Sequence, residues 1–102
     1  MIIESMIREH NYCSVVAFTP EHVYNAWMRV NTLHFYVLSS DKITDVIYHF
    51  TAHIENGEIH LMADGEAFTL YSHDELINTI RCAFPNYCND IITIVETLLY
   101  IE

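Results

Sequence analysis

The sequence predicts an α+β protein, an antiparallel β-meander sheet with helices packed on one face. Two turn signals, Asn56-Gly57 and Asp64-Gly65, separate three segments in which apolar and polar residues alternate. The segment from Ser72 to Glu75 follows at once and is typical of a helix capping box. Because a sheet with one apolar face needs a covering layer, helices are expected on that face.

The two turns can be tested against each other, since each fixes a register. Around Asn56-Gly57, His53 faces His60; around Asp64-Gly65, Leu61 faces Phe68. Both registers place one apolar set on the same face: Phe50, Ala52, Ile54, Ile59, Leu61, Phe68 and Leu70. A slip of one residue would destroy this agreement. The sequence therefore predicts consecutive antiparallel strands at about 44–54, 58–63 and 67–71.

Two helices are predicted after the meander. Ser72 is the expected N-cap, and apolar residues recur at helical spacing until Pro85, which should end the helix. The segment from Tyr87 to Ile101 places its aliphatic residues on one helical face. Its β-branched content leaves a strand as the alternative there.

The first forty residues carry weaker signals. Thr19-Pro20 is typical of a helix start, and Val23, Ala26, Trp27 and Val30 would then share one face. Residues 33–38 predict a strand that is apolar on both faces and hence buried, and residues 13–18 favour another strand. Residues 1–10 favour no single element.

Length and composition indicate one acidic domain spanning residues 1–102. The chain is 52% hydrophobic and carries a formal charge of −10. Between Lys42 and Arg81 there is no Lys or Arg, but there are seven carboxylates. Direct binding to nucleic acid or to an anionic membrane is not expected, because both require Lys and Arg clusters. Solubility alone is the competing explanation of the charge.

The cellular compartment is inferred from what the sequence contains. It has no recognisable secretory signal and no run of about 20 apolar residues. Its three cysteines, Cys13, Cys82 and Cys88, form no CxxC motif and are expected to be buried thiols. A cytoplasmic location is therefore expected.

The sequence does not predict an enzyme or a cofactor. The directly opposed His53 and His60 would have Cβ atoms ~4.5–5.5 Å apart, but they supply two ligands where a stable zinc site needs three or four. A metal-binding or small-ligand module built on this pair is the weakest of the functional hypotheses. Gly-rich phosphate loops and the HExxH and GxSxG motifs are absent.

Carboxylates form the remaining candidate site. Since Tyr71 lies opposite Glu58 in the predicted register, the first helix should begin at the end of the sheet that carries the Asn56-Gly57 turn. Acidic residues are expected to cluster there, and others mark the opposite end. The predicted partner-binding residues are Glu55, Glu58, Asp64, Glu66, Tyr71, Asp74 and Glu75. Helix-dipole stabilisation by the two in the first turn and simple solvation of the others is the alternative.

In size, acidity and lack of a catalytic signature, the chain is similar to small phage inhibitors of host defences, such as anti-restriction and anti-CRISPR proteins, and to bacterial toxin-immunity proteins. This likeness concerns composition only and nominates no residues. It implies a stoichiometric inhibitor that presents carboxylates as DNA presents phosphates and docks on a basic nuclease, toxin or defence complex. The alternative is a homo-oligomeric structural or regulatory domain, such as a homodimer, without inhibitor activity.

Overall fold

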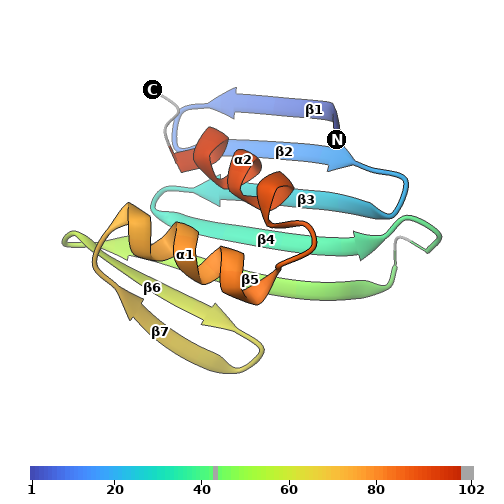
Figure 1. Ribbon diagram of the computed structural model, residues 1–102. Coiled ribbons are helices and arrows are strands. Elements are labelled where there is room, and N and C mark those ends of the chain that lie inside the picture. Colours follow the sequence, from blue (N-terminus) through green and yellow to red (C-terminus); the bar gives the residue numbers. More distant parts are fainter. Residues whose placement is uncertain (43, 100–102) are drawn as a thin grey trace.

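The computed structural model describes residues 1–42 and 44–99 and contains one seven-stranded antiparallel sheet with two helices (Figure 1). Strand order in the sheet equals sequence order, so each strand pairs with its neighbours along the chain. The strands are β1 (Ile2–Glu9), β2 (Tyr12–Phe18), β3 (His22–Arg29), β4 (Thr32–Ser39), β5 (Val46–Glu55), β6 (Glu58–Ala63) and β7 (Glu66–Leu70). The predicted α+β class and meander are confirmed.

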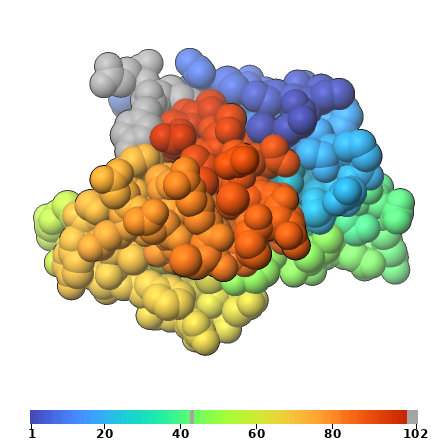
Figure 2. Space-filling model, viewed as in Figure 1, coloured from blue at the N-terminus to red at the C-terminus, as the bar shows by residue number. Residues whose placement is uncertain are grey.

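Both helices lie on the same face of the sheet. Helix α1 (His73–Ala83) covers the β5–β7 side and α2 (Cys88–Leu99) covers the β2–β4 side, while β1 and β7 form the two edges (Figures 1 and 2). The core between the layers includes Tyr24, Phe35, Leu76 and Ile91, all fully buried. Burying such side chains stabilises the fold by about 1.5–3 kcal/mol each before entropy is counted.

The C-terminal half follows the sequence-based expectation closely. His53 pairs with His60, and Leu61 pairs with Phe68. Ser72 is the N-cap of α1, and its Oγ accepts a hydrogen bond from the Glu75 backbone at 3.2 Å. Helix α1 ends at Ala83, two residues before the proline, and the second helix is confirmed over 88–99; the predicted residues 100 and 101 lie outside the described residues.

The helix predicted after Thr19-Pro20 is wrong, because residues 22–29 form β3 between β2 and β4. Thr19 makes the hydrogen bonds expected of a helix N-cap, but they stabilise a tight turn before β3. The Thr19 hydroxyl accepts from the backbones of Glu21 and His22 at 3.2 and 3.0 Å, and the Thr19 backbone donates to His22 O at 2.8 Å. Pairing on both sides of a segment rich in Val, Tyr and Trp outweighs the local helix-start signal.

Two hairpin turns in the N-terminal half contain no glycine. His10-Asn11 joins β1 to β2, and Val30-Asn31 joins β3 to β4. Asn11 and Val30 take the positive φ values that such turns need, 65° and 59°. Residues 1–10 thus belong mostly to an edge strand. The strand at 33–38 is confirmed, but its expected burial is wrong on one face: His34, Tyr36 and Leu38 are only half-buried.

Candidate functional site: the open face of the sheet

No helix of the described chain covers the second face of the sheet, which we call the open face. Strand pairing places a row of side chains across it: Trp27, His34, Thr51 and Met62 on β3 to β6. Tyr36 and His49 form the next row on one side, and His53 with His60 the next row on the other. The strands alternate, so these residues point away from the core.

Four rings on this face make a continuous stack. Trp27 stacks on His34 with ring centroids 5.0 Å apart and on Tyr36 with centroids 5.3 Å apart. Tyr36 stacks on His49 at 4.1 Å with an interplanar angle of 10°. Because each ring contacts a neighbouring ring, the stack forms a continuous, half-buried aromatic surface. The ring stack was not predicted from the sequence, because the segment after Thr19-Pro20 was expected to be helical.

His49 is a half-buried member of this ring stack. Its Nε2 atom is buried and has no hydrogen-bond partner. Burial lowers the pKa of His49, and the charge of His34 lowers it further. The imidazole is therefore kept neutral at a pH where an exposed histidine would begin to take up a proton.

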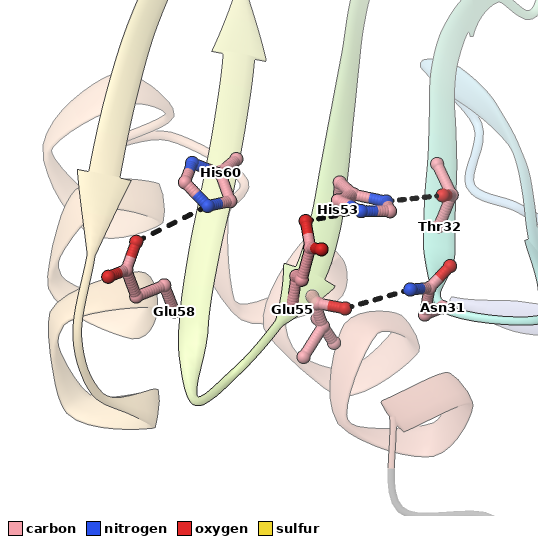
Figure 3. A network of polar contacts seen from close by, with 7 residues as sticks. Asn31, Thr32, His53, Glu55, Glu58 and His60 are labelled. Atoms are coloured by element: carbon pink, nitrogen blue, oxygen red, sulfur yellow. Dashed lines mark hydrogen bonds and ion pairs between the residues drawn. The ribbon is translucent and has the colours of Figure 1, made fainter.

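Two histidines and two glutamates lie beside the ring stack at the β5–β6 turn, and we call them the His–Glu quartet. His53 faces His60, and Glu55 faces Glu58. His53 Nε2 lies 3.4 Å from Glu55 Oε2, and His60 Nε2 lies 3.3 Å from Glu58 Oε2. Figure 3 shows each histidine turned toward the glutamate of its own strand, with the helices behind the sheet.

The β3–β4 turn holds this end of β5 in place. Thr32 Oγ1 and His53 Nδ1 are hydrogen-bonded at 2.9 Å, and the Asn31 side chain donates to Ile54 O at 3.0 Å (Figure 3). Asn31 also accepts from the Ile54 backbone at its own carbonyl, at 2.9 Å. The quartet is therefore presented by anchored strands, which limits how far Glu55 can move away from Glu58.

Comparison with family models, curated proteins and solved structures gives no match to this chain.

The carboxylates of the quartet have no strong cation beside them. Within residues 1–42 and 44–99, neither Glu55 nor Glu58 forms an ion pair with Lys or Arg. Lys42 pairs with Asp45 instead, with 3.8 Å between Nζ and Oδ1. Glu55 and Glu58 therefore give this end of the open face two carboxylates that no Lys or Arg of the described residues neutralises.

The predicted acidic cluster is divided by the sheet. Tyr71 follows Leu70, the partner of Ile59, so it lies level with Glu58 and is 66% exposed. Asp74 and Glu75 lie at the start of α1, on the helix side, and Glu75 Oε2 accepts a hydrogen bond from the Tyr71 backbone at 2.7 Å. The common end is as expected: one surface hollow is lined by Gly57 of the β5–β6 turn and by Ser72.

Asp64 and Glu66 flank the β6–β7 turn at the opposite end of these strands, as the sequence predicts. They share no surface with the quartet. They border a separate cavity under α1 instead, with Tyr48 beside them.

The arrangement of possible metal ligands and the exposure of the cysteines can be read from the described part of the chain. It holds no group of three or more His, Cys, Asp or Glu side chains arranged for a metal ion. The expectation of buried cysteines is wrong for Cys82, which is exposed on α1, while Cys13 and Cys88 are half-buried. None of its helices is long and apolar enough to cross a membrane.

Proposed function

We propose that the protein binds a basic protein partner through the open face of its sheet, with Glu55 and Glu58 as the charged end of the docking surface and Tyr71 as an aromatic contact at the same end. The observation that carries the proposal is the pair Glu55–Glu58, two carboxylates held directly opposite each other with no Lys or Arg partner among the described residues. Like charges in this position destabilise a sheet. A lysine or arginine from a partner would relieve that repulsion.

Arginine fits this arrangement better than lysine does. Its planar guanidinium presents several N–H donors at once and can bridge two carboxylates. His53 and His60 each contact one of the two glutamates, which reduces the side-chain freedom that the glutamates would lose on binding. The net charge of −10 would also speed the encounter with a cationic surface at low salt.

The ring stack supplies the apolar part of the same surface. Trp27 and Tyr36 lie one and two residue rows beyond His53 on the open face. Trp, Tyr and Arg are the residues that dominate interface energies when they are packed in the centre and surrounded by polar groups. A partner with basic side chains around an apolar contact is the kind of protein that this face suits.

Proteins that handle nucleic acids have such surfaces, since their grooves bind phosphates with Lys and Arg. A carboxylate-bearing face that occupies the groove would act as a stoichiometric, non-catalytic inhibitor. On this reasoning the protein is a phage-type anti-defence protein, anti-CRISPR or anti-restriction, or a toxin-immunity protein. Its partner is a nuclease, a toxin or a defence complex.

The test compares capture by three forms of the immobilised protein at rising salt: the natural chain, Glu55→Gln/Glu58→Gln, and Glu4→Gln/Glu9→Gln on β1 as a control with the same net charge. A specific partner should be retained by the natural chain and the control, lost by the first variant, and inhibited in its own nuclease or toxin assay. Capture that is equal for all three forms, with one salt dependence, would contradict the proposal.

The alternative, a homo-oligomeric domain, is favoured by β1. All eight residues of this edge strand are exposed, including Ile2, Ile3, Met6 and Ile7. Long apolar edges pair readily with a second strand. Light scattering during size-exclusion chromatography should show a dimer that Ile7→Lys dissociates, whereas Ile47→Lys, at another exposed isoleucine, should leave it intact. A monomer at micromolar concentration rejects this alternative.

A further inference from the structure

A cavity of about 200 Å³ lies between α1 and strands β5–β7. Its walls are mostly apolar and aromatic. The lining residues are Tyr48, Phe50, Leu61, Ala63, Asp64, Glu66, Phe68, Thr79, Ile80, Ala83 and Phe84. Small-molecule sites are typically concave and apolar with a few converging polar groups, and this cavity has that composition.

The aromatic walls are fixed by the core. Phe84 packs edge-on against Tyr48, with ring centroids 4.5 Å apart, and lies 6.0 Å from Phe50. Phe50 and Phe84 are nearly fully buried, whereas Phe68 is an exposed wall on the short edge strand β7. The cavity is therefore formed before any ligand arrives, and the exposed residues Asp64, Glu66 and Phe68 are part of its lining.

The charged groups that line the cavity, Asp64 and Glu66, favour a cation. Asp64 and Glu66 flank Gly65 in the turn, and the positive φ values of Asp64 and Gly65, 51° and 76°, fix its shape. Burial raises the pKa of Tyr48, and the negative charge of Asp64 and Glu66 raises it further. In the described chain, no Lys or Arg lines the cavity or forms an ion pair with either carboxylate.

We propose that this cavity binds a small organic ammonium with an aromatic or branched aliphatic body. The ammonium would lie between Asp64 and Glu66, and the body would pack against Phe50, Phe68 and Phe84. Carboxylates recognise the charge through hydrogen bonds, and ring faces attract it through their quadrupoles. A neutral ligand of the same shape would lose both terms, and an anion would be repelled.

The proposal does not depend on the proposed function. The cavity lies on the helix side at the β6–β7 turn, and the docking surface lies on the open face at the β5–β6 turn. A titration with an amine tests ligand binding in the cavity without any partner protein. A negative result would therefore overturn the cavity proposal and leave the proposed function unaffected.

The experiment is an NMR titration of the ¹⁵N-labelled protein with three probes of similar shape: phenethylamine, 2-phenylethanol and 3-phenylpropionate. Phenethylamine should bind at least about tenfold more tightly than 2-phenylethanol, a step of roughly 1.4 kcal/mol. Shifts should concentrate at the amides of Ala63, Gly65 and Thr79, and 3-phenylpropionate should cause none there. Equal binding of the three probes, or no binding of the amine, overturns the proposal.

Two variants separate the cavity from mere surface charge. Asp64→Asn/Glu66→Gln keeps a residue at position 64 that tolerates positive φ, and it should weaken amine binding about tenfold. The control Glu4→Gln/Glu9→Gln, with the same net charge, should bind as the natural chain does. Ala83→Leu places a larger side chain at a position of α1 that lines the cavity, and it leaves both carboxylates in place.

Ala83→Leu should abolish binding of the amine, and a folded Ala83→Leu protein that binds it normally would refute the cavity as the site. This variant decides the question alone if the double variant does not fold. Loss of binding in the Glu4/Glu9 control as well would show long-range charge attraction only, and it would also overturn the proposal.

Discussion

Val30 is the residue whose replacement should stabilise the protein most directly. It is a β-branched residue at φ 59° in the two-residue turn between β3 and β4, and it is 69% exposed. When positive φ falls on the first residue of such a turn, glycine is preferred. Substitution Val30→Gly should therefore remove backbone strain and sacrifice little buried surface.

The expected gain follows from two opposing terms. Positive φ costs an L-residue roughly 1–2 kcal/mol, with the upper end appropriate for a β-branched side chain. Glycine makes the unfolded chain more flexible, which costs about 0.5–1 kcal/mol. The net expectation is a stabilisation of about 1 kcal/mol, or ~4–8 °C in Tm for a domain of this size. The hydrogen bond from the residue 30 backbone to Asn11 O, 2.9 Å long, is retained in the variant.

Urea unfolding followed by far-UV circular dichroism measures the change, with a thermal melt as a second readout. Asn11→Val is the matched opposite, because Asn11 has φ 65° in the β1–β2 turn and tolerates it better than valine would. That variant should be destabilised by about 1–2 kcal/mol. A Val30→Gly protein that is no more stable than the natural chain would show that the turn is unstrained, and the reasoning would fail.

Three further outcomes are expected. Phe35→Ala, which removes a fully buried ring stacked on Phe50 with centroids 5.0 Å apart, should cost about 3–5 kcal/mol in urea unfolding. Ser72→Ala should cost ~1 kcal/mol through loss of the α1 cap, and Ser72→Asp should recover most of it. The pKa of His49 is lowered in the folded protein, so the unfolded chain binds this proton more tightly and stability should fall as the pH drops below 6.5. The variant His49→Phe keeps an aromatic ring in the stack but does not titrate. Denaturation midpoints measured between pH 7.5 and 5.5 should therefore change less with pH in this variant than in the natural chain.

The C-terminal half could be predicted because its two hairpin turns have recognisable Asn-Gly and Asp-Gly sequences. Asn56-Gly57 and Asp64-Gly65 each fix a register, and two agreeing registers define a face. The turns at His10-Asn11 and Val30-Asn31 give no such signal, since a valine takes the strained position in one of them. Without them, local helix-start chemistry at Thr19 was the strongest clue, and tertiary pairing overrode it.

The candidate site was predictable only in part, for the same reason. The opposition of Glu55 and Glu58 follows from a turn that the sequence makes plain. The separation of Asp74 and Glu75 from them depends on the face over which α1 folds back, which no local pattern specifies. The ring stack needs β3 and β4 as neighbours, so it became visible only with the complete sheet.

The sequential strand order has a consequence for how the chain folds on the ribosome. Each hairpin can close soon after it is synthesised, because every strand pairs with the one just before it. The two helices are synthesised after all seven strands, so the apolar face of the sheet stays uncovered until residues 73–99 emerge. A nascent chain stalled at this stage would expose Phe35, Phe50 and Leu61 to water, and it would be the form most in need of a chaperone.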